Sequence, residues 1–268
     1  MRTLIIPALI VLAGRAAALD VTACGQVVSS GDVGVLQADL ACTAPVPGIR
    51  LETGATLDLN GHALTTVGAA AVACEGRRCV VTSTPSSGAL SGSPAAACLT
   101  TVARTRLSIA NVAVHDCGTC IDGNVANLAD QGANVRATNV TVERCSGSGI
   151  VARRLRATGI AVTDAGDSGI AVEGRVQGIG LVASRNGRNG VFARSVVLRD
   201  AVVDENAGIG IASTGGMKVT TAEILNNNRL LDGIDVASTR RPRFVAVICG
   251  RSAQFGTAGT PWGICAGD

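Results

Sequence analysis

Short runs of aliphatic and β-branched residues, separated by Gly, Asn and Asp, recur along most of the chain at a nearly constant interval. In each repeat an apolar residue follows a glycine, with successive spacings of 20, 21, 20 and 23 residues: Ile150, Ile170, Val191, Ile211 and Ile234. Towards the N-terminus the same position continues through Ile121, Leu99, Val72 and Ile49. A period of this length, with short strand-like runs, predicts a solenoid of β-strands.

Two other repeat architectures fit the pattern less well. Left-handed hexapeptide helices need a six-residue sub-period, and leucine-rich repeats need Leu at fixed positions with a helical or extended return segment. The return segments here are short, rich in Val and interrupted by Gly. The sequence therefore predicts an all-β, right-handed parallel β-helix with about three short strands in each coil of 20–23 residues. We place the helix at residues 48–248, between capping segments at 19–47 and 249–268.

Stacked parallel strands place equivalent residues of successive coils about 4.8 Å apart, so each position in the repeat becomes a column. One turn position reads Cys117, Cys145, Ala165, Asn186, Asn206, Asn227. We expect Asn186, Asn206 and Asn227 to form a ladder of side-chain amides. The preceding position alternates in charge: Asp116, Arg144, Asp164, Arg185, Glu205. A second outward column, Arg153, Glu173 and Arg194, alternates as well.

The same columns suggest how the ten cysteines pair. Cys117 and Cys145 share a column, and Cys98 and Cys120 both precede the inward residue of adjacent coils, so we expect bridges Cys117–Cys145 and Cys98–Cys120. The remaining cysteines are then expected to close the ends and one local loop: Cys24–Cys42, Cys74–Cys79 and Cys249–Cys265. A redox-active C-x-x-C site at Cys117–Cys120 is disfavoured, because such sites need a helix N-terminus.

The N-terminus has the features of a secretory signal. Residues 1–18 contain Arg2, a short apolar run and the small residues Ala16–Ala18 before the expected cleavage point. Cleavage would remove Arg2 and Arg15 and lower the formal charge from +3 to +1. We therefore expect a secreted or extracytoplasmic protein with oxidised cysteines, no membrane span and no affinity for nucleic acid.

The stretch GIRLETGATLDLNGHAL at residues 48–64, followed by the Gly-Ile coils, resembles secreted right-handed β-helix proteins of the pectin-lyase-like superfamily. The resemblance covers nearly all of the mature chain. It implies the fold, but the superfamily includes polysaccharide lyases, glycoside hydrolases, uronan epimerases, phage tailspikes and exported proteins without demonstrated activity. Its enzymes place their site on the outer face of a strand column, where the lyases use an Arg or Lys base beside calcium held by Asp or Glu.

The chain offers few residues for such chemistry. The outward position after the repeated Ile reads Asp122, Val151, Ala171, Phe192, Ala212, Asp235, so its carboxylates would lie five coils apart. That separation, about 24 Å, far exceeds the ~5–9.5 Å of a glycosidase pair. The best catalytic candidates are Arg153, Glu173, Arg194 and Asp122. We expect no cofactor and no bound metal, with calcium relevant only to a lyase.

These observations favour an exported, non-catalytic β-helix protein that serves as a structural or polymer-binding surface module. Its expected partner is an extracellular polysaccharide or another cell-surface polymer. The alternative is a polysaccharide lyase or uronan epimerase that acts on an outer strand face, with Arg153 or Arg194 as base.

Overall fold

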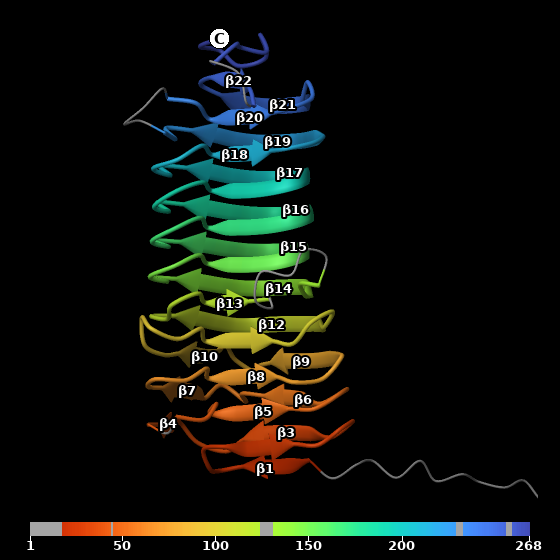
Figure 1. Cartoon of the computed structure of the whole chain (residues 1–268), viewed down its shortest axis with the longest axis vertical. Helices are drawn as coiled ribbons and strands as arrows, with labels where there is room; N and C mark the ends of the chain where they lie inside the picture. The colour runs from red at the N-terminus through yellow and green to blue at the C-terminus, as the bar shows by residue number, and fades with distance from the viewer. Residues whose placement is uncertain (1–17, 44, 124–130, 229–232, 256–258) are drawn as a thin grey trace, which may run out of the picture.

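The computed structural model describes residues 18–43, 45–123, 131–228, 233–255 and 259–268. Over these residues the chain forms a parallel β-solenoid without a helix, and its strands pile up in sequence order along one axis (Figure 1). No helix in the described residues has the length and hydropathy that a bilayer crossing requires. Residues 1–17 of the expected signal peptide lie outside the described part of the chain.

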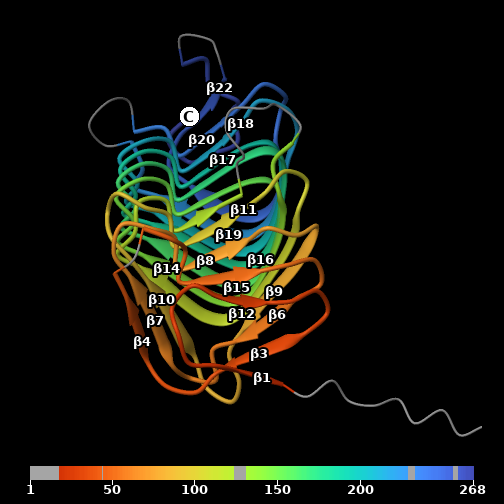
Figure 2. The same cartoon turned by 60° about the horizontal axis from the view of Figure 1, so that its bottom comes forward.

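Three stacks of parallel strands make up the wall of the solenoid, and Figure 2 shows the coils lying over one another. The first stack contains eight short strands: β2 Gln26–Val28, β5 Ile49–Leu51, β8 Val72–Cys74, β11 Leu99–Thr101, β13 Ile121–Asp122, β18 Ile211–Ser213, β20 Val236–Ser238 and β22 Ser252–Gln254. The second contains β1 Leu19–Val21, β3 Val33–Leu36, β6 Thr56–Asp58 and β9 Arg78–Thr82. The third contains β4 Leu40–Cys42, β7 Ala63–Thr66 and β10 Gly88–Ser91.

Seven longer strands bend and take part in more than one stack: β12 Arg106–His115, β14 Asn134–Glu143, β15 Ile150–Thr163, β16 Ile170–Ser184, β17 Val191–Asp204, β19 Met217–Leu225 and β21 Arg243–Cys249. Each bends at a residue with positive φ, such as Asn139 (52°), Gly159 (60°), Gly180 (62°) and Asp200 (53°). Gly, Asn and Asp adopt this left-handed conformation more readily than other residues. A left-handed corner therefore separates the second stack from the third in each of these coils.

The predicted apolar column forms the centre of the core. Ile121, Ile150, Ile170, Val191 and Ile211 are register partners in turn, and each side chain is fully buried. The column also extends back through Leu99, Val72 and Ile49, as predicted.

At its C-terminal end, however, the predicted column is wrong by two residues. Ile211 pairs with Val236, and Ile234 lies in the preceding turn. The connection from β19 to β20 is longer than in the preceding coils, so the Gly233–Ile234 dipeptide reproduces the repeated Gly-apolar pattern before the strand begins.

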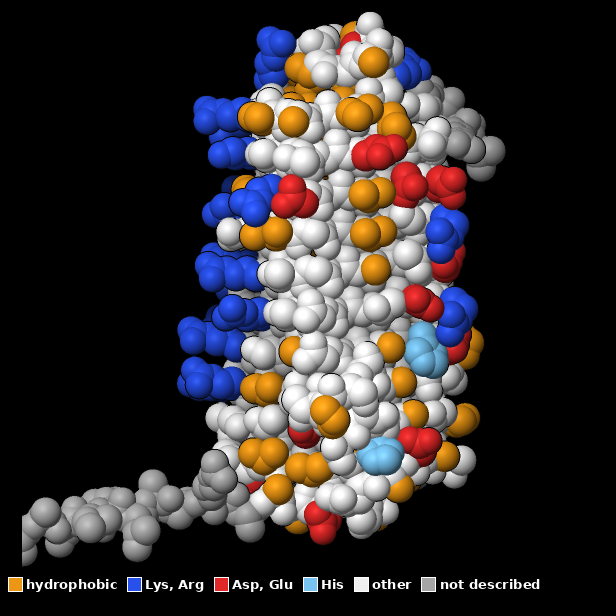
Figure 3. All heavy atoms as spheres, turned by 180° about the vertical axis from the view of Figure 1, so that it is seen from behind, with side chains coloured by type: hydrophobic (Ala, Val, Ile, Leu, Met, Phe, Trp, Pro, Cys, Tyr) orange, Lys and Arg blue, Asp and Glu red, His pale blue; other side chains and the backbone are white. Residues whose placement is uncertain are grey.

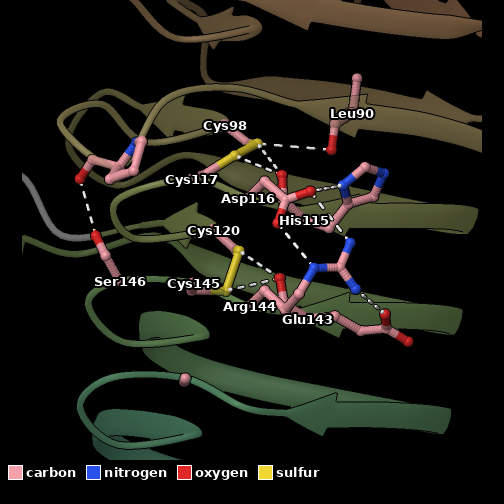
Figure 4. Close-up of a disulfide and its surroundings, with 12 residues drawn as sticks. Leu90, Cys98, His115, Asp116, Cys117, Cys120, Glu143, Arg144, Cys145 and Ser146 are labelled. Carbon is pink, nitrogen blue, oxygen red and sulfur yellow. Dashed lines mark hydrogen bonds and ion pairs between the residues drawn. A yellow bond between two sulfur atoms is a disulfide. The ribbon is translucent and has the colours of Figure 1, made fainter.

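Five disulfides join the ten cysteines, and three of them confirm the predicted pairs: Cys24–Cys42, Cys74–Cys79 and Cys249–Cys265. The predicted bridges Cys98–Cys120 and Cys117–Cys145 are wrong. The structure instead joins Cys98 to Cys117 and Cys120 to Cys145, each with 5.6 Å between the Cα atoms (Figure 4).

The two columns were correctly aligned, but the side chains point across the turn and not along the stack. The sulfur atoms of Cys98 and Cys117 both approach the carbonyl oxygen of His115, at 3.6 and 3.2 Å. Those of Cys120 and Cys145 both lie 3.8 Å from the carbonyl oxygen of Glu143. Each bridge therefore runs diagonally, from the residue before a first-stack strand to the turn column of the following coil.

Proteolysis under non-reducing conditions, followed by mass spectrometry, is expected to yield peptides linked through Cys98–Cys117 and Cys120–Cys145. The Cα separations lie in the range of about 4.4–6.8 Å that a disulfide requires. Recovery of a Cys98–Cys120 peptide from the native protein would contradict the diagonal arrangement.

Candidate functional site

The predicted asparagine ladder is present in the interior of the solenoid. Asn186 donates its side-chain Nδ2–H to Oδ1 of Asn206 at 2.7 Å, and Asn206 donates in the same way to Asn227 at 2.8 Å. Each Oδ1 also accepts a backbone N–H from the preceding coil at 3.1 Å. The three side chains are almost completely buried, so the ladder satisfies polar groups that water does not reach.

A buried carboxylate ends this ladder. Oδ1 of Asp235 accepts the backbone N–H and the Nδ2–H of Asn227, at 3.0 and 2.9 Å. Its Oδ2 accepts the backbone N–H of Gly250 at 2.8 Å. The sequence placed Asp235 on the outer face, and this prediction is wrong because Val236 occupies the inward strand position next to it. Asp235 therefore has a structural role.

Two of the neighbouring pairs in the charge column beside the ladder form ion pairs, as predicted. Arg144 binds Asp116 at 2.8 Å, and Arg185 binds Asp164 at 2.9 Å. The hydrogen bond from Arg144, aided by His115, lowers the pKa of Asp116 to about 2 (Figure 4). These groups are half-exposed and paired with one another, so they form a surface ladder and offer no free acid or base.

Replacing Asp116 by asparagine is expected to lower the free energy of unfolding at pH 7 by less than about 1 kcal/mol, because solvent screens this half-exposed pair. The folded-state pKa of Asp116 lies below its ordinary value of 3.8, so the contribution is present above pH 4 and disappears as the pH falls through about 2. Urea unfolding of both proteins between pH 7 and 2 tests this. The Glu223→Gln variant, at an exposed position, is the control, and a difference that grows towards pH 2 would contradict the assignment.

The predicted catalytic candidates do not assemble into one constellation. Asp122 and Arg153 are half-buried and each already engages another group, whereas Glu173 and Arg194 are exposed. Within the described chain no ion pair joins Glu173 to Arg153 or Arg194, so the predicted alternation in that column does not produce a salt-bridge ladder. Among the described residues no group of three or more His, Cys, Asp or Glu could hold a metal ion.

A row of basic side chains follows one outer edge of the solenoid, where Figure 3 shows them as blue groups stacked one above another along much of its length. The second stack supplies most of them, because its register places Arg78 beside Arg106, Arg136 beside Arg156 and Arg154 beside Arg175. We call this surface the arginine edge and define it as Arg77, Arg78, Arg104, Arg106, Arg136, Arg154, Arg156, Arg175, Arg194, Lys218, Arg240 and Arg243.

The arginine edge contains two shallow grooves. One of about 660 Å³ is lined by Thr53, Gly54, Arg77, Arg78, Ala103, Arg104 and Arg106. The other, of about 670 Å³, is lined mainly by Arg154, Arg156, Arg175, Arg194 and Arg240 with glycines and small polar residues. Neither lining contains an aspartate or glutamate. From the coil of Arg78 to that of Arg243 the edge rises seven strand spacings, or about 34 Å.

The basic residues of the edge are not neutralised by the part of the chain that the structure describes. None of them forms an ion pair with a described residue, in contrast to Arg144, Arg185 and Arg188 on other parts of the surface. Like charges on adjacent strands destabilise a sheet, so this arrangement opposes folding when no ligand is bound. An extended polyanion would relieve the repulsion and accept bidentate hydrogen bonds from the guanidinium groups.

Sequence reasoning missed the arginine edge because it considered the net charge and not its distribution. Many of the acidic residues that balance the charge are held in ion pairs outside the edge. A signal was present in the Arg-x-Arg spacing of Arg154 and Arg156, which places both side chains on one face of a strand. Comparison of the chain with known protein families, curated proteins and solved structures found no match to any of them.

Proposed function

We propose that the protein is an exported, non-catalytic β-solenoid that binds an extended acidic polysaccharide along the arginine edge. The observation that carries this proposal is a row of basic side chains on consecutive coils, none of which pairs with an acidic residue among those the structure describes. Because the strands fix the backbone beneath every side chain, the edge is a rigid, linear array, and a linear chain of repeated anionic units matches it.

Three features favour a polysaccharide over a nucleic acid as the partner. The five disulfides suggest an oxidising, extracellular environment, where acidic polysaccharides are common partners. Single-stranded nucleic acids bind by stacking bases on aromatic side chains, and the arginine edge contains none. The resemblance of residues 48–64 and the following coils to pectin-lyase-like proteins also supports a carbohydrate ligand.

The arrangement of the candidate catalytic residues favours binding without chemistry. A lyase or epimerase needs a base positioned against acidic groups that hold calcium or substrate. Arg194 lies in the second groove, but the lining of that groove contains no carboxylate, and Asp122 belongs to the first stack three coils before the coil of Arg194. These positions disfavour a lyase or epimerase, and the experiment below distinguishes this alternative from simple binding.

Affinity electrophoresis of the purified protein in gels with acidic or neutral polysaccharides tests the proposal. We expect retardation by polyuronates or sulfated glycans and none by neutral glucans, with no new ultraviolet absorbance from unsaturated ends. Migration unchanged by every acidic polysaccharide would overturn the proposal. Retardation by single-stranded DNA alone would indicate a nucleic acid as the partner. Formation of ultraviolet-absorbing products from a polysaccharide would indicate that the protein is a lyase.

A further inference from the structure

The groove nearest the N-terminus gathers four arginines of the arginine edge over one short turn. Three segments build it: the turn at Thr53 and Gly54, the pair Arg77–Arg78, and residues 103–106. Backbone hydrogen bonds lock these segments together, since Gly54 N–H donates to the carbonyl of Arg78 at 2.6 Å and Arg106 N–H to that of Arg77 at 2.9 Å. Four arginines thus come from a small, fixed region of backbone.

Arg104 occupies a backbone position that elsewhere in this fold belongs to glycine. Three four-residue turns, at 29–32, 52–55 and 102–105, are each closed by a hydrogen bond from the last N–H to the first carbonyl. The third residue of each has positive φ: 82° at Gly31, 83° at Gly54 and 59° at Arg104. Glycine adopts this conformation without steric cost, whereas arginine does not. The other two arginines with positive φ, Arg144 (50°) and Arg185 (54°), each bind an aspartate, whereas Arg104 forms no ion pair with a described residue.

The number of guanidinium groups indicates which anion fits. A carboxylate has two oxygens in one plane, and one arginine can saturate them with a bidentate pair of hydrogen bonds. A phosphate ester offers three strongly accepting oxygens and a charge of about −1.5 to −2, and so engages several arginines from different directions. The sulfate ester shares its tetrahedral shape. No carboxylate lines the groove to compete, and its volume of about 660 Å³ falls within the ~300–1,000 Å³ typical of small-molecule sites.

We infer that the four-arginine groove, formed by Arg77, Arg78, Arg104 and Arg106 over the turn at Thr53 and Gly54, binds a sugar that carries a tetrahedral sulfate or phosphate ester. The identity of the natural ligand rests on the proposed function, because the ester is then part of the polysaccharide that follows the arginine edge. The affinity of the groove for the ester can be measured separately.

Isothermal titration of the full chain with glucose 6-sulfate, glucose 6-phosphate and glucuronate tests the inference. We expect at least one ester to bind at least tenfold more tightly than glucuronate, and the preferred ester identifies the source. Arg104→Gly should reduce that affinity at least tenfold while the melting temperature stays the same or rises, because glycine relieves the turn. Arg188→Ala, which removes the same charge elsewhere, should leave the affinity unchanged.

Equal affinities for glucuronate and both esters, or an Arg104→Gly variant that binds as the wild type does, would overturn the inference. Failure of this inference can be told apart from failure of the proposed function. Polymer binding without ester selectivity removes the groove assignment alone, whereas ester binding without retardation by any acidic polysaccharide removes the polymer-binding function alone.

Discussion

Replacing Asn206 by alanine is expected to lower the free energy of unfolding by at least about 3 kcal/mol. Its Oδ1 accepts two hydrogen bonds from Asn186, one from the backbone N–H and one from the side-chain amide. Its Nδ2 donates to the carbonyl of Ala183 at 2.9 Å and to Asn227 at 2.8 Å. Alanine would leave several of these buried N–H and C=O groups without a hydrogen bond, and each unsatisfied group costs about 1–3 kcal/mol of folding free energy.

Urea unfolding followed by circular dichroism measures this effect. Gln177→Ala is a matched control, because it also removes a side-chain amide from a strand of the same solenoid but at an exposed position. The control is expected to change the unfolding free energy by less than about 0.5 kcal/mol. A loss below about 1 kcal/mol for Asn206→Ala would show that the ladder does not contribute in the way its hydrogen bonds indicate.

Removing three arginines from the second groove is expected to abolish most of the binding to an acidic polysaccharide. The triple variant Arg154→Ala/Arg175→Ala/Arg194→Ala takes three adjacent cationic groups from the arginine edge. Since a hydrogen bond to a charged group contributes about 1.5–3 kcal/mol, the expected loss of affinity is about 100-fold or more. The melting temperature should stay constant or rise, because repulsion between neighbouring strands is reduced.

A variant with the same change in net charge separates the edge from general electrostatic attraction. Arg144→Ala/Arg185→Ala/Arg188→Ala removes three arginines that pair with acidic residues away from the edge. Surface plasmon resonance on immobilised polysaccharide should show near-wild-type affinity for this protein. Equal losses in both triple variants would mean that the ligand responds to total charge and not to the arginine edge.

The repeat in the sequence determines the register of the coils because a parallel stack places residues one period apart over one another. The apolar column from Ile49 to Ile211 and the asparagine ladder follow directly from this rule. The rule fails where a coil changes length, as before Val236, because the Gly-apolar pattern also occurs at Gly233–Ile234 in the turn. It also cannot give the direction of a side chain, so Cys98 and Cys117 were each assigned to the wrong partner.

The arginine edge could not be predicted from the repeated apolar column, because it depends on which outward residues of different coils meet in the fold. Its members come from many coils and from both strands and turns, and they meet only when the second stack brings Arg78 beside Arg106 and Arg154 beside Arg175. The net charge of +3 conceals this because acidic residues balance the arginines along the chain. Alignment of the repeats would have revealed the edge if the charges had been compared at every outward position, and not only at the position after the repeated Ile.

Chemical footprinting of the arginines tests most directly where a polymer binds. The protein is treated with phenylglyoxal, with and without the polysaccharide that retards it most, and modification is measured for each arginine by mass spectrometry. Binding along the edge predicts protection of Arg78, Arg106, Arg136, Arg154 and Arg175 on successive coils, with Arg185 and Arg188 modified equally in both samples. Protection confined to Arg185 and Arg188, or spread evenly over all exposed arginines, would contradict a polymer-binding site on this edge.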